Sequence, residues 1–378
     1  MKEYIVVGAG ITGAVISRHL AEKGCKVTVV DKRSTIAGNL YEEKNENGIL
    51  VQKYGPHIFH TNSVRVYDYI NKYGEWEDYF LECMVYMNGK YTPSPFNFKT
   101  IDDYYPAETA ELIKEHIKAK YNGAEKATIV EMLLSDDPII KEYADFLFDN
   151  DYKLYTAKQW GISPDEIDIS VLKRVPVLFS YKTGYFDDVY QCMPKCGFTS
   201  VIANILNHEN ITVKLDTDAL SFIEIRGEEL LIDGKPTDKT VVYTGAVDEL
   251  MRCSYGVLPY RSLRFEYENK DMDSYQDAPV VAYPQVDGFT RITEYTKLPV
   301  QNGNGKTVIA REYPLPYVAG KTEPYYPIPT EESKALYEKY RAHLEKIPNL
   351  ILCGRLADYK YYNMDQAIER ALELCETL

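Results

Sequence analysis

A glycine-rich turn near the N-terminus constrains the fold more than any other feature of the sequence. Residues 8–13 read Gly-Ala-Gly-Ile-Thr-Gly and follow an apolar stretch at residues 4–7. Residues 11–23 then carry apolar side chains at helical spacing, and residues 26–30 form a second apolar stretch. The order strand, tight turn, helix and strand predicts a βαβ unit, and such units build parallel sheets covered by helices.

Each glycine of this turn has a distinct physical task if the turn binds a dinucleotide. Gly8 permits the tight turn, Gly10 lets the backbone approach a pyrophosphate, and Gly13 allows close packing of helix on strand. The helix N-terminus, which includes Thr12, offers free N–H groups and a positive dipole end to the phosphates. Asp31 ends the second strand, where an acid binds ribose hydroxyls. An ordinary glycine-rich turn would not require that acid, so we predict a dinucleotide site.

Three further features favour FAD over NAD as the dinucleotide. A second glycine-bearing loop follows Asp31, Thr244-Gly245 follows an apolar strand, and Gly354-Arg355 follows another late in the chain. The last two resemble places where flavoproteins of this fold contact FAD. The loop after Asp31 contributes four predicted cofactor residues: Lys32, Gly38, Asn39 and Leu40.

The rest of the chain predicts an α/β protein with two additions to a Rossmann-like FAD-binding domain. Residues 101–173 show helical patterns, whereas residues 258–313 are rich in β-forming side chains and Asn88-Gly89 signals a hairpin. We expect a discontinuous FAD-binding domain, an inserted helical domain ending in a mobile loop, and an antiparallel β-sheet domain. Their expected bounds are 1–80, 190–255 and 340–378 for the first; 100–175 for the second; 81–99, 176–189 and 256–339 for the third.

Charge and composition exclude several classes of function. The formal net charge is −14, which argues against binding to nucleic acid or anionic membranes. No stretch reaches the roughly 20 apolar residues that cross a bilayer. Seven cysteines occur, an odd number without CxxC spacing, so we expect reduced thiols and a cytoplasmic protein. His57 and His60 are three residues apart, but no further ligand cluster accompanies them, and we predict no metal site.

Several segments, spread in order over almost the whole chain, resemble the UDP-galactopyranose mutase family of bacterial type. The histidine loop, the Lys-Gln-Trp-Gly segment and the two arginine segments are more specific than the glycine turn. The segments are Val6–Gly10, Lys53–Thr61, Tyr155–Gly161, Leu172–Pro176, Tyr185-Phe186, Thr290–Glu294, Glu323–Pro327 and Gly354–Tyr362.

The resemblance implies an isomerase that interconverts UDP-galactopyranose and UDP-galactofuranose with no net redox change. In that family FAD must be reduced, and its N5 atom attacks the anomeric carbon of the sugar while UDP leaves. An external reductant, such as NAD(P)H or a flavin reductase, would then be needed. The family is usually dimeric and its product supplies galactofuranose for cell-surface polysaccharide, so a homodimer serving that biosynthesis is expected.

The family also implies roles for individual side chains of this sequence. Charge grows on the departing diphosphate, and Arg174 and Arg291 would grip it, because guanidinium groups match phosphate and stay charged. Arg174 would lie in a loop that closes over the substrate. Tyr152 would stack on the uracil, and Trp160 would contact the nucleotide or sugar. Hydroxyl groups expected to donate to the diphosphate belong to Tyr155, Tyr185, Tyr325 and Tyr361. Taken one at a time, each of these residues would more often be an ordinary packing or surface residue.

The remaining implied roles concern the flavin. His57 would lie nearest to N5, His60 would approach the flavin or its ribose, and Arg355 would lie beside the ring. A helix that begins near Met364 would direct its N-terminus at the pyrimidine edge and stabilise the charge of reduced flavin. Two hydrogen-bonded structural histidines remain the alternative for the histidine loop.

Two positions depart from the family pattern, and the second of them leaves the substrate open. Ala37 stands where members often have glycine, and Asn363 stands where members often have an aspartate that contacts the substrate side of the site. The alternatives are a mutase for another sugar nucleotide (a dTDP-6-deoxy-sugar or a UDP-N-acetylhexosamine), an FAD-dependent oxidoreductase, or a non-catalytic nucleotide-sugar binding protein. The arginine pair favours a mutase, since an oxidase has no evident need to hold a diphosphate.

Overall fold

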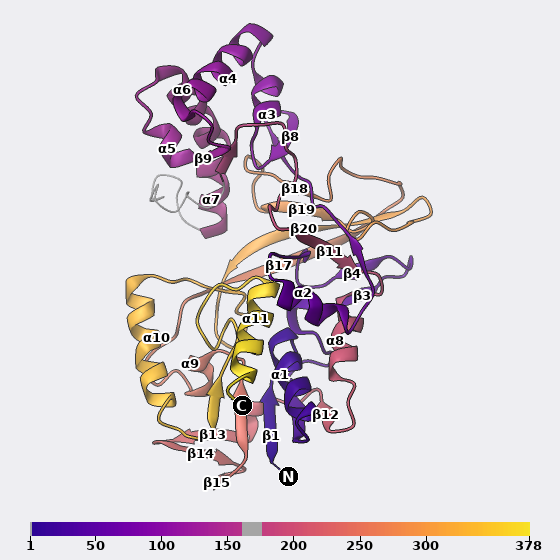
Figure 1. The fold of residues 1–378 in the computed structure, drawn as a ribbon, viewed down its shortest axis with the longest axis vertical. Helices are drawn as coiled ribbons and strands as arrows, with labels where there is room; N and C mark the ends of the chain where they lie inside the picture. The colour runs from indigo at the N-terminus through magenta and orange to yellow at the C-terminus, as the bar shows by residue number, and fades with distance from the viewer. Residues whose placement is uncertain (1, 161–175) are drawn as a thin grey trace.

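A computed structural model describes residues 2–160 and 176–378 of the chain. Three regions follow one another along the long axis of the molecule (Figure 1). A parallel sheet with its helices lies at one end, a larger mixed sheet lies in the middle, and a helical region lies at the other end. Among the described residues, no helix is both long and apolar enough to cross a lipid bilayer.

The parallel sheet is assembled from distant parts of the chain. The pairs β1–β2, β1–β16, β2–β12 and β16–β22 are all parallel, and the central strands are rich in buried valine and isoleucine. This arrangement confirms the predicted α/β fold with a Rossmann-like unit built from separate segments. In spatial order the described strands are β12 (Ile211–Lys214), β2 (Lys26–Val30), β1 (Glu3–Val7), β16 (Thr240–Tyr243) and β22 (Leu350–Leu352).

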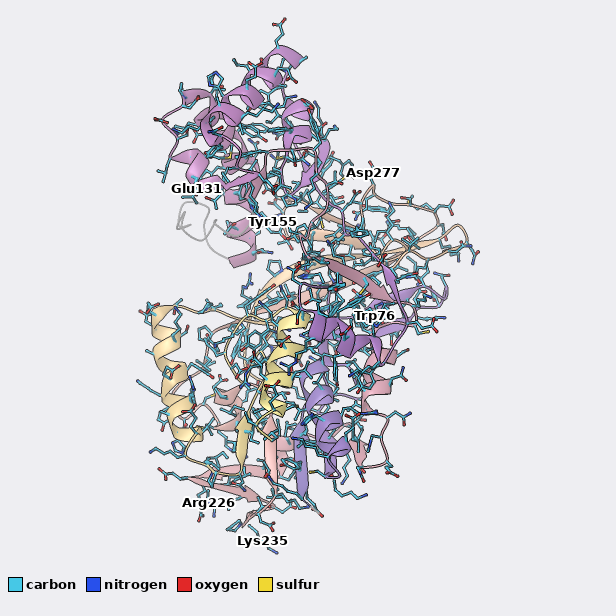
Figure 2. The ribbon with its side chains drawn as sticks, viewed as in Figure 1. Trp76, Glu131, Tyr155, Arg226, Lys235 and Asp277 are labelled. Atoms are coloured by element: carbon cyan, nitrogen blue, oxygen red, sulfur yellow. The ribbon has the colours of Figure 1, made fainter. Side chains whose placement is uncertain are left out.

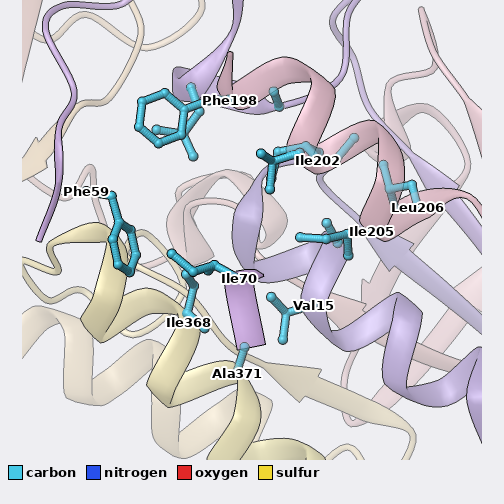
Figure 3. Packing of buried hydrophobic residues seen from close by; sticks show 14 of the residues in the cluster. Val15, Phe59, Ile70, Phe198, Ile202, Ile205, Leu206, Ile368 and Ala371 are labelled. Atoms are coloured by element: carbon cyan, nitrogen blue, oxygen red, sulfur yellow. The ribbon is translucent and has the colours of Figure 1, made fainter. Parts of the chain in front are cut away.

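A large apolar cluster fixes the helices against this sheet. Val15, Ile202, Ile368 and Ala371, from three different helices, are almost fully buried in it (Figure 3). Burying one large aliphatic side chain contributes about 1.5–3 kcal/mol, so the cluster holds these helices firmly beside the sheet. The helices of this end are α1 (Ile11–Glu22), α2 (Val64–Asn71), α8 (Phe198–Leu206), α9 (Val247–Leu250), α10 (Glu331–Leu344) and α11 (Met364–Cys375), with short 3₁₀ turns at Gly38–Leu40 and Ala219–Ser221.

The mixed sheet is mostly antiparallel, as predicted. The long strands β17 and β20 pair along ten residues, and Asn88-Gly89 closes the β7–β8 hairpin with both residues at positive φ. Within this sheet, β7–β18 is the one parallel pair among the described residues. In spatial order the strands are β21 (Tyr326–Pro327), β17 (Tyr260–Lys270), β20 (Thr307–Pro316), β19 (Arg291–Glu294), β18 (Val280–Ala282), β7 (Cys83–Met87) and β8 (Lys90–Ser94).

The helical region follows β8 and has its own core, in which Ile117, Ile129, Ile140 and Tyr143 are buried. Its strand β9 (Lys126–Thr128) pairs with β10 (Pro176–Leu178). The sequence predicts residues 176–189 in the sheet domain. The start of this segment packs with the helical region instead, because β10 pairs with β9. The helices are α3 (Phe98–Tyr104), α4 (Ala107–Tyr121), α5 (Ile129–Leu133), α6 (Pro138–Leu147), the π-helix η2 (Phe148–Tyr152) and α7 (Lys153–Trp160).

Three small sheets complete the described chain. In the first, β11 lies between β5 and β6. This sheet therefore holds β11, which follows the helical region in the chain, against the strand at the end of the histidine loop. Their strands are β5 (Phe59–Thr61), β11 (Tyr190–Pro194) and β6 (Trp76–Asp78); β13 (Ile223–Arg226), β14 (Glu229–Ile232) and β15 (Lys235–Pro236); and β3 (Glu42–Lys44) and β4 (Leu50–Gln52).

Candidate active site

One cavity of about 1340 Å³ reaches from the glycine turn to the helical region. Pockets for one small ligand usually measure about 300–1,000 Å³, so this cavity is larger than a site for one small ligand requires. Its wall includes most of the residues predicted for cofactor and substrate. They are Gly8, Gly10, Thr12, Gly13, Asp31, Lys32, Gly38, Asn39, Leu40, His57, His60, Tyr152, Tyr155, Tyr185, Arg291, Arg355, Tyr361, Asn363 and Met364.

The glycine turn leaves no space for a side chain at Gly8 or Gly13. Gly8 has a φ of +108°, which only glycine adopts readily, and a Cβ on Gly13 would lie 1.9 Å from the Gly8 carbonyl oxygen. A Cβ on Gly38, which has a φ of +55°, would lie 3.2 Å from the Gly10 Cα. The two loops therefore present bare backbone to the cavity, as a pyrophosphate requires.

Asp31 joins the end of β2 to this turn. Its Oδ2 accepts a hydrogen bond from the Ala9 backbone N–H at 2.8 Å, and its Oδ1 accepts one from the Arg33 N–H at 2.9 Å. A carboxylate has about four acceptor positions, so lone pairs remain for hydroxyl donors of a ligand. The acid is thus fixed in place at the cavity wall.

The ends of two further strands converge on the same turn. The Thr244 hydroxyl, just after β16, donates to the Val7 carbonyl at 2.7 Å. Gly354, just after β22, has a φ of +116°, and a Cβ there would lie 3.3 Å from Thr12. In a parallel sheet the carboxyl ends of neighbouring strands share one edge, which is where ligands of such folds bind.

Arg33 is a cavity residue that the sequence alone did not single out. Both terminal nitrogens of its guanidinium lie 3.1 Å from Asn39 Oδ1, and Nη2 also lies 3.1 Å from Glu323. The group lies over the ring of Tyr54, 4.3 Å from its centroid. Its position in the second glycine-bearing loop was visible in the sequence, but its direction toward the cavity was not.

His57 is held as a neutral imidazole of defined tautomer. Its Nδ1 lies 2.8 Å from the Gly55 carbonyl, which can only accept, so Nδ1 carries the proton and Nε2 has a free lone pair. Burial, together with the nearby cations Arg355 and Arg291, lowers the pKa of His57 to about 4. Gln52 accepts from the His57 N–H at 2.6 Å and donates to its carbonyl at 3.0 Å.

His60 is anchored by different groups. Its Nδ1 lies 2.9 Å from Asp188, and its ring stacks on Phe186 with centroids 3.7 Å apart. Within residues 2–160 and 176–378, no cluster of three or more His, Cys, Asp or Glu side chains could hold a metal ion. The histidine pair therefore has separate surroundings instead of a common ligand.

Arg291 is fixed by a buried carboxylate. Register pairs Arg291 of β19 with Glu312 of β20, and Oε2 of Glu312 lies 2.8 Å from Nε and 2.7 Å from Nη2. Burial opposes the charge of the guanidinium, but Glu312 outweighs it and keeps the pKa of Arg291 above its ordinary value. Tyr155 lies close enough to this pair to interact with it electrostatically. Burial raises the pKa of Tyr155, so its phenol stays protonated.

The tyrosine predictions need one correction. Tyr325 is buried beside Tyr54 and Phe265 and does not line the cavity, whereas its neighbour Tyr326 does. Successive residues of a strand point to opposite faces, and β21 turns Tyr326 toward the site. Its ring stacks on Tyr361 with centroids 5.2 Å apart.

Cations surround Tyr326. The guanidinium groups of Arg355 and Arg261 lie 5.0 Å and 5.2 Å from its ring centroid. Arg261 also lines the cavity and was not predicted; strand β17 pairs it directly with Tyr326. This end of the mixed sheet is therefore a positively charged wall with hydroxyl groups, although the whole chain is acidic.

The last helix begins at the cavity. Asn363 precedes α11, and its backbone N–H donates to Gln366 Oε1 at 3.0 Å. Asn363, Met364 and Ala367 line the wall, so the positive end of a twelve-residue helix faces the cavity.

The helical region supplies the opposite wall. Tyr155 lies on α7, on the side of the helical region that faces the rest of the molecule (Figure 2). Tyr152, Tyr155 and Gln159 line the cavity. The side chain of Trp160 and the whole of Arg174 lie outside the described residues, so their predicted roles stay predictions.

Comparison with known proteins supports the resemblance over the full length of the chain. A model of the family described as UDP-galactopyranose mutase matches residues 150–361, and a model described as an NAD(P)-binding Rossmann-like domain matches residues 6–73. A probable UDP-galactopyranose mutase of Klebsiella pneumoniae is 35% identical over 99% of this chain and 94% of that protein. A dTDP-fucopyranose mutase of Escherichia coli is 33% identical over 100% and 98%.

The fold agrees with these relatives. The crystal structure of a reduced UDP-galactopyranose mutase superimposes with a TM-score of 0.72 at 16% identity, covering 100% of this chain and 93% of that one. Identity over nearly the whole length, together with the family match, decides the assignment. The chain belongs to the UDP-galactopyranose mutase family of isomerases.

Proposed function

We propose that the protein interconverts UDP-galactopyranose and UDP-galactofuranose with FAD as its cofactor. The observation that carries the proposal is the pairing of two features in one cavity. A bare glycine cradle suits a dinucleotide, and Arg291, fixed by Glu312, offers a permanent cation to a second, anionic ligand.

The residues of the cradle fit FAD. Backbone at Gly10 and Gly38 is open to a pyrophosphate, Asp31 keeps acceptor positions for a ribose, and α11 directs its positive end at the cavity. When bound and reduced, FAD supplies the nucleophile for the anomeric carbon, with no net redox change. The other residues that would hold it are Gly8, Thr12, Gly13, Lys32, Asn39, Leu40, His57, His60, Arg355 and Met364.

The cationic wall suits the departure and return of a diphosphate. Negative charge develops on the leaving oxygen, and a cation already fixed in a cavity stabilises it without reorganisation. The guanidinium of Arg291 is held in one orientation, because Glu312 contacts two of its nitrogens. Neutral phenols at Tyr155 and Tyr326 can add hydrogen bonds, together with Tyr185 and Tyr361. Arg174 and Trp160 would join them from beyond the described part of the chain.

His57 would act as a hydrogen-bond acceptor near the reacting atoms. A pKa of about 4 keeps its ring neutral at ordinary pH, and Nε2 is the unprotonated nitrogen. A neutral acceptor can hold an N–H or O–H group without adding a positive charge next to the sugar. This role is compatible with repeated cycles, since the residue neither gains nor loses a proton overall.

A second candidate substrate is a dTDP-6-deoxy-sugar. It is favoured by the dTDP-fucopyranose mutase relative, which matches over the full chain, and by Asn363 in the cavity wall. An FAD-dependent oxidoreductase is the weaker alternative, because Arg291 would then have no evident anionic ligand to bind.

One assay separates these functions. The purified protein is reduced with dithionite without oxygen and given UDP-galactofuranose, and UDP-galactopyranose is followed by chromatography. We expect many turnovers per reducing equivalent. Consumption of one reductant or oxidant per product would instead establish an oxidoreductase. The same assay is run with dTDP-fucofuranose, and conversion of that substrate alone would establish the second candidate. We also expect electrons to come from NAD(P)H or a flavin reductase, and the protein to be a homodimer.

A further inference from the structure

Asp151 is a buried carboxyl in the cavity wall. It lies in the π-helix η2, its residue is 8% exposed, and it lines the cavity. Within the described chain its carboxyl has no hydrogen-bond partner, and its oxygens are not fully enclosed by protein atoms. A polar group in a nearly buried cavity wall without a protein partner is available to a ligand, and such a group calls for an explanation such as a functional role. π-Helical turns are also frequent at functional sites.

The cation that interacts with this carboxyl, Lys158, forms no ion pair with it. The Lys158 ammonium of α7 donates to the backbone carbonyls of Tyr283 and Val286 at 2.5 Å and of Phe289 at 2.9 Å. It therefore fastens α7 to the turn between β18 and β19. Asp151 feels its charge but forms no ion pair with it.

The order of groups in a nucleotide sugar places the base at this end of the cavity. In the proposed function the sugar lies beside the flavin ring, near His57 and Arg355, and the diphosphate lies at Arg291. The nucleoside then extends away from the cradle toward the helical region. Phe96 and Tyr152 form an aromatic corner there, with centroids 5.6 Å apart and planes at 61°. An aromatic surface of this kind suits a planar base.

The surroundings favour the neutral form of the carboxyl. The titratable groups of the described chain that interact with it are Tyr152 beside it, Tyr104 on α3, and Tyr155 and Lys158 on α7. Burial raises the pKa of Asp151 to about 7, although Lys158 opposes this. A neutral carboxyl has one O–H donor and one carbonyl acceptor.

We propose that Asp151 contacts the base of the nucleotide, as a neutral carboxyl that pairs with the imide edge of uracil or thymine. Its carbonyl oxygen accepts from the base N–H, and its O–H donates to the adjacent base carbonyl. This assignment rests on the proposed function and adds a base-contacting residue to it. It also explains why an acid can remain in an apolar corner, since the ligand satisfies both of its oxygens.

Binding as a function of pH tests the assignment. The oxidised holoenzyme is titrated with UDP-galactose by calorimetry at pH 6 and pH 8, a range in which this diphosphate diester does not ionise. With a pKa of about 7, the neutral fraction of Asp151 falls from about nine-tenths to about one-tenth, so affinity should fall about tenfold. Asp151→Asn, which always has a donor and an acceptor, should remove most of this fall. Asp151→Leu should bind weakly at both pH values.

Asp149→Asn is the matched control, because Asp149 lies on the same π-helix but is exposed and does not line the cavity. It should behave like the wild type. An affinity that rises with pH would overturn the proposal and indicate an ionised Asp151 bound to ribose hydroxyls. An equal fall in the wild type and in Asp151→Asn would overturn it too. Flavin absorbance verifies that each variant is folded. If the wild type bound neither UDP-galactose nor a dTDP-sugar, the proposed function itself would fail.

Discussion

Replacement of Arg291 by alanine should affect both the proposed catalytic role of this residue and its structural role. The two contacts to Glu312, at 2.8 Å and 2.7 Å, join side chains that are 27% and 5% exposed. Without Arg291 the Glu312 carboxylate is left buried and unpaired, which costs about 3–5 kcal/mol of stability. Loss of a fixed cation at a developing charge lowers kcat by about 10²–10³-fold, or about 2.7–4 kcal/mol. We therefore expect both the free energy of unfolding and kcat to fall.

A double variant tells these two effects apart. Arg291→Met with Glu312→Gln removes the buried charge as well as the cation, so stability should largely return while turnover stays lost. Stability is measured by urea denaturation and turnover by the anaerobic chromatographic assay, with flavin absorbance as a check on cofactor binding. Near-normal turnover of the double variant would refute the role of Arg291. Unchanged stability of the single variant would refute the energetic importance of the buried pair.

Further predictions concern the cradle, the tyrosine pair, the closing loop and the pH dependence of stability. Gly13→Ala should purify without flavin, because its Cβ would lie 1.9 Å from a carbonyl oxygen; normal yellow absorbance would contradict this. Tyr326→Phe should lower kcat at least several-fold and Tyr325→Phe should not, since only Tyr326 lines the cavity; equal rates would count against the site. Arg174→Ala should abolish turnover with flavin still bound, and a near-normal rate would show that the resemblance misplaces this residue. Burial raises the pKa of Glu42 from 4.5 to about 7, so this group's contribution to stability is full below about pH 4.5 and declines by about 3 kcal/mol as pH rises to 8. Glu42→Gln should flatten that part of the pH profile in thermal denaturation, and an unchanged profile would refute the shift.

Much of the cofactor half was predictable because its signals are local. Gly8, Gly13 and Asp31 belong to one strand–turn–helix–strand unit, and their spacing reflects a geometry that neighbouring residues create by themselves. The Asn88-Gly89 hairpin is local in the same way. In these two units, residues that are close in the sequence are also close in space, so spacing alone predicts the local structure.

The substrate half depended on tertiary contacts. Arg291 and Glu312 are 21 residues apart and meet only because β19 and β20 pair in one register. Tyr325 and Tyr326 are chemically identical neighbours, and the pairing of β21 with β17 decides which one faces the cavity. A shift of one residue in a strand reverses the face of every side chain, so composition and spacing cannot make this choice.

The sequence by itself thus determined the fold class, the dinucleotide cradle and the family resemblance, because glycine turns and apolar periodicity act over short distances. Only the tertiary structure decided that Glu312 fixes Arg291, that Tyr326 and not Tyr325 lines the cavity, and that Asp151 lies in the cavity wall without a hydrogen-bond partner in the described chain. Each of these depends on burial or on pairing between distant strands and helices. Those properties arise when the chain packs, and no short segment carries them alone.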